Sequence, residues 1–420
     1  LSCLTGKTFA ARRTAVGRTS APGRRVALLS TSSGRRSRQA AKSSSARRTY
    51  LNPRLHPPNV GSRNAPQNVD VALHFPELAR TSVLIEVNPI KKLYQRLSDV
   101  GLTRAFVKKT ALPSWWDDEV AANPSGYAQG LLLLSRHLGL DLASLQLEDE
   151  PIRLRDFGTC KFKKRSDVSE DDLALARVLA TRAAQLAASA VSTPAVAIPV
   201  NASDIRQQIL GDDAPWVGLD ELLRYCWSIG LPVLHLDHFP KNVKRPDGFA
   251  ARVNGRPVIV LCRHAKYSAW LLFILAHELG HLALGHVPDE GPLIDQGLDE
   301  DSVDVEEQQA NAFAIELLTG HRIRRIIAAG RWPNAEGLAR LAQELGRQAM
   351  IDPGHVVLNY AHSMEGSFFP VSNAALKLLE PNADAVAKVR TKMAENLDWS
   401  RLPEDSSEFL MKVTQQSQSE

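Results

Sequence analysis

Residues 268–281 read SAWLLFILAHELGH, and this stretch decides the fold of the central part of the chain. Its apolar run Ala269–Ala276 is the longest uninterrupted one in the sequence and leads directly into His277-Glu278-Leu279-Gly280-His281. Residues four apart in an α-helix differ by only about 40° around the axis, so the two imidazoles leave one face and can bind the same metal ion. Two histidines and a glutamate in so apolar a helix are costly to desolvate without a partner. The stretch therefore predicts a buried helix with a metal site and disfavours the alternative, a pair of hydrogen-bonded core histidines.

Zinc is the ion that we expect at this site, because two imidazoles and one carboxylate leave an open position in a tetrahedral zinc site. Glu278 directly follows His277 in the sequence, so it cannot easily join the same pair of ligands. It lies where a general base for a metal-activated water should be. We therefore predict His277 and His281 as metal ligands and Glu278 as the catalytic residue.

The third ligand is expected after this helix. His286 is displaced by one position from the last histidine of the extended motif HExxHxxGxxH, so we do not expect it to be a ligand. The run 289–307 that follows holds nine Asp and Glu residues and no Lys or Arg. Carboxylates of this run are therefore the candidates for the remaining ligand.

Glu307 is the predicted third ligand, because it shares one face of a helix predicted over about 302–318 with small residues. These small residues are Ala310, Asn311 and Ala314. A face of small residues would let this helix approach the HExxH helix closely, so that the Glu307 carboxylate can reach the metal. The alternative ligands are Glu306 and Asp304.

The two motifs together resemble a known family. HELGHLALGH at 277–286 and EQQANAFAIELL at 307–318 are similar to the ImmA/IrrE family of bacterial metallopeptidases, and the resemblance covers about residues 215–320. The family usually continues LLMP, whereas this chain continues Leu317-Leu318-Thr319-Gly320, which affects the end of the helix and not the ligands. Members often carry a DNA-binding domain upstream.

The resemblance implies a zinc-dependent endopeptidase that cleaves a helix-turn-helix repressor or an antitoxin-like regulator. By motif, His277 and His281 match the two histidine ligands, Glu307 matches the carboxylate ligand, and Glu278 matches the general base. A donor that stabilises the oxyanion is expected in addition. The sequence does not choose among its candidates, which are Tyr267, His355, Tyr360 and His362.

The pattern around the motif predicts an α+β fold that is mostly helical. Short β-type runs are expected at 231–236, 248–253 and 257–262, and Asn254-Gly255 between the last two is a strong hairpin signal. We expect a small zincin-like core, in which a short β-sheet packs on the HExxH helix, flanked by helical regions. The predicted regions are a disordered basic tail at 1–69, a helical domain at 80–192, the zincin-like metallopeptidase core at 204–320 and a helical C-terminal region at 321–420.

The basic character of the chain belongs to the predicted tail. Residues 1–69 carry 14 Lys and Arg and no Asp or Glu, whereas residues 70–420 carry 37 basic and 46 acidic groups. The tail is too poor in apolar clusters to fold. It could be passive, it could be a targeting peptide, or it could contact nucleic acid through its arginines. The acidic remainder would suit a basic partner, such as a DNA-binding repressor.

The cellular location is predicted from cysteine usage and hydropathy. The four cysteines are scattered, with no CxxC pair, which favours a reducing compartment. No apolar run approaches the length of a bilayer span. We therefore predict a cytoplasmic protein without membrane contact.

Two hypotheses of function follow from the sequence. The first is the zinc endopeptidase acting on a regulatory protein. The alternative is a DNA-binding or toxin-associated regulatory protein whose zinc site is structural or weakly active; the basic tail and a candidate helix-turn-helix at 131–145 support it. Glu278 speaks against the alternative, because a structural zinc site has no need of a base beside its ligands.

Overall fold

A computed structural model describes residues 89–155, 161–162, 170–241, 243–287, 300–322, 325–326, 333–364 and 369–415. All of these residues belong to one compact unit. The predicted basic tail at 1–69 lies outside the described residues, so its three interpretations stay predictions. No helix in the described ranges is both long enough and apolar enough to cross a bilayer.

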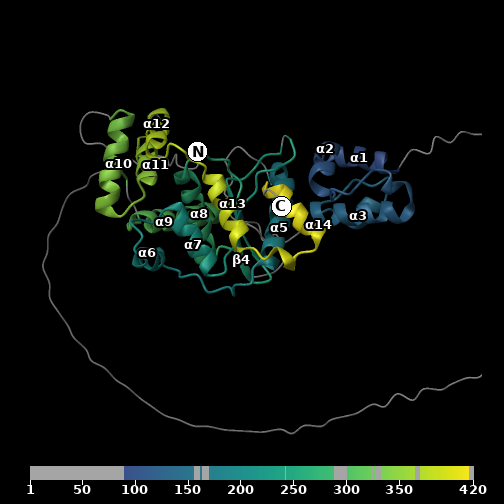
Figure 1. Cartoon of the computed structure of the whole chain (residues 1–420), viewed down its shortest axis with the longest axis horizontal. Coiled ribbons are helices and arrows are strands. Elements are labelled where there is room, and N and C mark those ends of the chain that lie inside the picture. Colours follow the sequence, from purple (N-terminus) through teal and green to yellow (C-terminus); the bar gives the residue numbers. More distant parts are fainter. Residues whose placement is uncertain are drawn as a thin grey trace, which may run out of the picture. The chain divides into compact units, whose positions relative to one another are not determined.

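The first described region is a group of helices (Figure 1), and capping residues fix the ends of α3 and α4. In the order of the chain they are α1 Pro89–Asp99, α2 Arg104–Phe106, the π-helical turn Val107–Ala111, the 3₁₀ turn Val120–Ala122, α3 Pro124–Leu138 and α4 Leu142–Gln146. Asn123 caps α3 by accepting from the Gly126 N–H, and α3 ends at Gly139, which adopts a left-handed φ of 60°. Asp141 then caps α4. Two helices thus meet at Gly139, within the candidate helix-turn-helix at 131–145, but the second has only five residues.

A four-stranded sheet forms the centre of the fold. Its strands are β1 Lys161–Phe162, β2 Val233–His235, β3 Gly248–Val253 and β4 Arg256–Leu261, in the spatial order β1-β3-β4-β2. β3 and β4 pair antiparallel through the predicted hairpin, where Asn254 and Gly255 have φ angles of 50° and 77°. Two consecutive positive φ angles are what a type I′ hairpin turn requires, and Asn-Gly tolerates them. β2 runs parallel to β4, and β1 pairs antiparallel with β3.

The sequence interpretation was wrong at β1. The first strand was expected at 231–236, yet Lys161 and Phe162 already pair with Ala250 and Phe249 of β3. A two-residue strand has no periodicity of its own, so only the neighbouring strand reveals it. Residues 163–165 lie outside the described part of the chain.

Helices cover both faces of the sheet, which confirms the α+β class with a short sheet packed on the HExxH helix. On one face Leu234, Phe249 and Val258 share a core with Leu179 of α5 (Glu170–Ala190). On the other face Val233 and Ile259 pack with α7 (Leu219–Ser228) and α8 (Ser268–Ala283), and α8 is the predicted metal-binding helix. Since α5 lies within the predicted helical domain 80–192, that region and the zincin-like core share one hydrophobic core.

A connecting segment leads from α5 to α6, which begins at Ala202 and runs to Gly211. Part of this segment is held by the sheet region: Val196 N–H donates to the Ile229 carbonyl, and Arg256 donates to the Thr193 carbonyl. The segment is therefore fixed to the core by one backbone hydrogen bond and one hydrogen bond from an arginine side chain.

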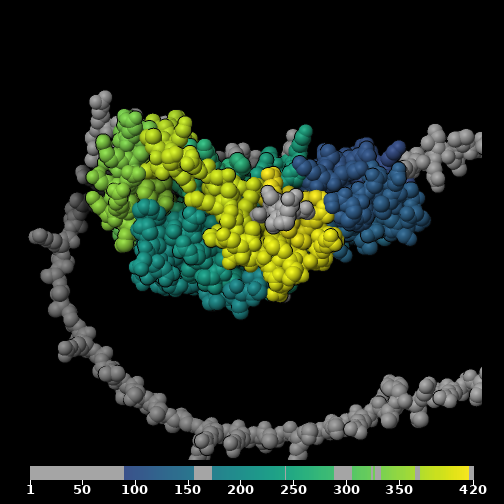
Figure 2. Space-filling view, in the orientation of Figure 1, coloured from purple at the N-terminus to yellow at the C-terminus, as the bar shows by residue number. Residues whose placement is uncertain are grey.

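The rest of the described chain is helical. The helices are α9 Glu300–Thr319, α10 Ala335–Ala349, α11 Pro353–Ser363, α12 Phe369–Leu379, α13 Ala385–Asn396 and α14 Glu404–Thr414, with a 3₁₀ turn at Trp399–Arg401. Helices α10, α11 and α12 pack around a core of their own. α13 contacts β2, and Val413 of α14 accepts from the backbone N–H groups of Asp237 and His238. In the view of Figure 2, α13 and α14 lie at the surface and are coloured yellow.

Candidate metal centre

Two histidines of α8 face one another inside the core. His277 and His281 are 0% and 1% exposed. Their ring centroids lie 4.7 Å apart, and the two Nε2 atoms are separated by 3.1 Å. The i, i+4 spacing therefore brings both imidazoles to one point on the helix face, as the sequence predicted.

Helix α9 approaches this face at Gly280, which lies between the two histidines. A Cβ added to Gly280 would lie 3.1 Å from the ring of Phe313 and 3.3 Å from the Cα of Ala310, both on α9. A larger side chain at position 280 would push the helices apart. The close approach brings Glu307 to the histidines, with Oε1 at 3.2 Å from Nε2 of His281 and Oε2 at 3.4 Å from Nε2 of His277.

The C-terminal end of α9 is held by a buried arginine from α6. Arg206 donates from Nη1 to the carbonyls of Leu317 and Leu318, at 3.1 and 3.0 Å, and from Nη2 to the Met350 carbonyl at 2.6 Å. These acceptors include carbonyls at the ends of α9 and α10, which have no partner within their helices. Arg206 thus ties the helix that carries Glu307 to two other elements. Nothing in the local sequence pattern of Arg206 indicated this role.

The three side chains form a donor set that suits a metal ion. One ligand atom from each of His277, His281 and Glu307 lies within 4.8 Å of the others. Two imidazole nitrogens and a carboxylate oxygen are ligands that zinc accepts, and they leave room for a water or substrate oxygen. The residues present therefore fit zinc.

The far side of each imidazole is also engaged. His277 Nδ1 lies 3.0 Å from Oδ1 of Asn311 on α9, and His281 Nδ1 lies 3.1 Å from Nδ1 of His286. A carbonyl oxygen can only accept, so His277 carries its proton on Nδ1 and presents a lone pair at Nε2. In the sequence, Asn311 stands out only as a small residue on the predicted helix face, and no local pattern indicates this contact.

Glu278 is completely buried between α8 and the sheet. A Cβ added to Gly248, the first residue of β3, would lie 2.6 Å from Oε1 of Glu278. The Cys262 thiol after β4 is close as well: burial raises its pKa, and the charge of Glu278 raises it further. Glycine in a strand often marks a close approach, and here it makes room for the predicted base.

The alternative ligands and oxyanion donors lie as follows. Glu306 is half-buried and is not part of the three-residue group, and the side chain of Asp304 lies outside the description. His355 is 3% exposed and stacks on Phe273 with centroids 6.2 Å apart. Tyr360 is also buried, whereas Tyr267 and His362 are half-buried. The structure does not single out one of these four as the oxyanion donor.

Comparison with known proteins agrees with this geometry. Residues 228–348 match a peptidase family model, Peptidase M78, whose description is the IrrE N-terminal-like domain. The match includes α8, α9 and all three side chains of the candidate metal centre. Neither a curated protein nor a solved structure matches the chain significantly. Residues 228–348 are therefore similar to the IrrE N-terminal-like domain, in agreement with the resemblance of the two motifs to the ImmA/IrrE family of peptidases.

Proposed function

We propose that this protein is a zinc-dependent endopeptidase. The observation that carries the proposal is the convergence of His277, His281 and Glu307 on one point, with Glu278 buried beside them. Three ligands leave one position for water or substrate, which is the arrangement of catalytic and not of structural zinc sites.

Glu278 is the residue that moves the proton. When zinc is bound, it supplies a Lewis acid that lowers the pKa of water towards neutrality and polarises the peptide carbonyl. Glu278 would accept the proton of the attacking water and then deliver it to the leaving amine. His277, His281 and Glu307 would hold the ion on one face of α8, and Gly248 leaves the space in which the Glu278 carboxylate lies. Burial of the carboxylate strengthens its interaction with charge that develops in the reaction.

For the substrate, we propose a helix-turn-helix repressor or an antitoxin-like regulator in the cytoplasm. The family resemblance supports this substrate class, and so does charge, because residues 70–420 carry 46 acidic and 37 basic groups and would attract a basic partner. Cys226 and Cys262 are free and buried, which suits a reducing compartment.

The alternative is a DNA-binding or toxin-associated regulator with a structural or weakly active zinc site. Its candidate reader, α4, has five residues. In the region 89–155 five basic side chains are engaged in ion pairs, namely Lys92, Arg104, Lys108, Arg136 and Arg153. A paired base is less available to phosphate. The peptidase proposal is therefore better supported.

Glu278→Gln tests the proposal, because glutamine keeps the size of the side chain but cannot accept the proton. The variant should fold and retain zinc, while cleavage of a co-expressed helix-turn-helix protein should fall by at least about 10²-fold. Glu306→Gln, one residue from a ligand but outside the donor set, is the matched control and should cleave normally. If Glu278→Gln relieves repression in cells as well as the wild type does, proteolysis is not how this protein acts.

A further inference from the structure

The histidine that follows the HExxH helix belongs to a chain of contacts that begins at a predicted metal ligand. His281 Nδ1 lies 3.1 Å from His286 Nδ1, and His286 Nε2 lies 2.9 Å from Oε1 of Gln309. The first ring is buried, the second is half-buried, and Gln309 is exposed on α9. The contacts thus run from the interior to the surface. They begin at Nδ1 of His281, so its Nε2 stays directed at the candidate metal site.

We infer that His286 and Gln309 are positioning residues, which hold His281 in the one tautomer that can bind the metal. The inference rests on the proposed zinc site. Binding through Nε2 requires that the proton of His281 be on Nδ1, so that Nδ1–H donates to His286. His286 Nδ1 must then accept, which places the proton of this second ring on Nε2. That N–H donates to the Gln309 carbonyl oxygen, which can only accept.

The backbone brings His286 to this place. Helix α8 ends at Ala283, and Gly285 follows with a left-handed φ of 76°. This conformation reverses the chain, so that the His286 N–H donates to the His281 carbonyl at 3.0 Å. The two rings then meet at 67° with centroids 5.2 Å apart. Glycine at 285 is suited to this turn, because other residues adopt a positive φ only at a cost.

The two ligand histidines are supported differently, although both supports end on α9. His277 reaches Asn311 directly, whereas His281 reaches Gln309 through His286. Glu307 lies on the same helix. One helix therefore supplies the carboxylate ligand and fixes the orientation of both imidazoles. His286 lies outside the donor set because it occupies the Nδ1 side of His281, away from Nε2.

A matched pair of substitutions tests the inference through metal affinity. His286→Asn retains an acceptor near the position of Nδ1, whereas His286→Leu does not. Partners of this kind typically contribute a factor of 10 to 100 in metal affinity, so His286→Leu should bind zinc about 10- to 100-fold more weakly than the wild type. His286→Asn should recover most of that loss. Gln309→Leu changes an exposed residue and should weaken binding in the same direction, while His321→Leu, an exposed histidine, is the control.

Zinc dissociation constants would be measured on the full chain by competition with a chromophoric chelator, and cobalt(II) spectra would report the coordination of the site. All variants should bind one metal ion at saturation, with the wild-type cobalt spectrum preserved in His286→Asn. If His286→Leu binds zinc as tightly as the wild type, or if His286→Asn binds as weakly as His286→Leu, the inference is wrong. It is also wrong if His286→Leu cannot bind one ion at saturation, because His286 would then be a ligand.

A different result would contradict the proposed zinc site itself. In that case His277→Ala would leave zinc binding unchanged, whatever the result at position 286. If His277→Ala abolishes zinc binding and His286→Leu has no effect, the site stands and only the positioning role is lost.

Discussion

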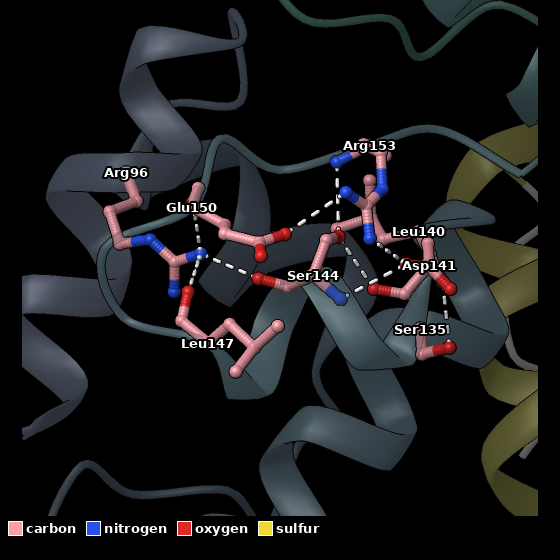
Figure 3. A network of polar contacts seen from close by, with 8 residues as sticks. All are labelled: Arg96, Ser135, Leu140, Asp141, Ser144, Leu147, Glu150 and Arg153. Atoms are coloured by element: carbon pink, nitrogen blue, oxygen red, sulfur yellow. Dashed lines mark hydrogen bonds and ion pairs between the residues drawn. The ribbon is translucent and has the colours of Figure 1, made fainter.

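Two polar clusters of this protein, one around Arg96 and one around His277, differ in how their donors and acceptors are balanced. Arg96 of α1 donates to four backbone carbonyls, those of Ser144 at 2.6 Å, Leu145 at 3.1 Å, Leu147 at 2.9 Å and Glu150 at 2.8 Å. Figure 3 shows Arg96 with its acceptors Ser144, Leu147 and Glu150. Asp141, Ser144 and Arg153 form further donor–acceptor pairs in the same view. Every contact drawn there joins a donor to an acceptor.

The cluster around His277 is arranged in the opposite way. Two Nε2 atoms lie 3.1 Å apart, and both oxygens of the Glu307 carboxylate face them. The Nδ1 atoms are turned outward to Asn311 and His286. With both imidazoles neutral and protonated on Nδ1, lone pairs thus converge on one point, and a cation satisfies such a point. A polar cluster that binds a ligand is therefore recognised by acceptors that converge on one point, and not by the number of its polar residues.

The largest expected effect is the loss of zinc affinity on substitution of Glu307. Glu307→Gln replaces a charged ligand by a neutral amide. Zinc affinity should fall by more than about 100-fold, because even the partners of ligands contribute 10- to 100-fold. Chelator competition would measure the loss, with Glu306→Gln as the neighbouring control. Equal losses in the two variants would mean that α9 is rotated from the orientation described above.

In the donor-to-acceptor cluster, removal of the central donor should reduce stability and leave the metal in place. Arg96→Met keeps the length of the side chain but removes its hydrogen bonds to four carbonyls. The free energy of unfolding should fall by about 2 kcal/mol, the contribution of one or two charged hydrogen bonds. Urea unfolding would measure it.

Arg153→Met is the matched control in the same cluster. The Arg153 side chain is 55% exposed and pairs with Asp141 and Glu150, so its loss should cost less than about 1 kcal/mol. An unchanged stability of Arg96→Met, or a loss of zinc affinity in it, would break the distinction between the two clusters.

The smallest effect concerns His355, a buried histidine in neither cluster. Among the residues that the structure describes, its ring nitrogens have no hydrogen-bond partner. Burial, together with the charges of His362 and Arg206, lowers its pKa to about 4. A lowered pKa means that the unfolded state takes up the proton first, so this contribution to stability is complete above pH 6.5 and is lost as the pH falls towards 4.

His355→Phe keeps the ring on Phe273 and removes this titration. Between pH 7 and pH 5.5 the metal-free wild type should lose about 1 kcal/mol more stability than the variant, since one pKa unit corresponds to about 1.4 kcal/mol. Urea unfolding at the two pH values measures the difference, in which contributions common to both proteins cancel. Equal losses would show that His355 is hydrated in the folded protein.

Much of the centre of this fold follows from the sequence alone, because it depends on short-range geometry. The spacing of His277 and His281 dictates a shared helix face. Asn254-Gly255 predicts the hairpin, since few residues tolerate two positive φ angles. The small residues after Glu307 predict that α9 can come close to α8, and at Gly280 it does.

Only the tertiary structure decided the contacts between segments distant in the chain. No local period indicates that Lys161–Phe162 adds a strand to the sheet, that α5 covers one of its faces, or that Gly248 makes room for Glu278. Asn311 and Gln309 of α9 contact His277 and His286 only because α9 lies in one register against α8. The packing of the whole helices sets that register. The sequence by itself therefore determined which residues can act on one helix face, and the packing of distant elements decided which groups hold them there.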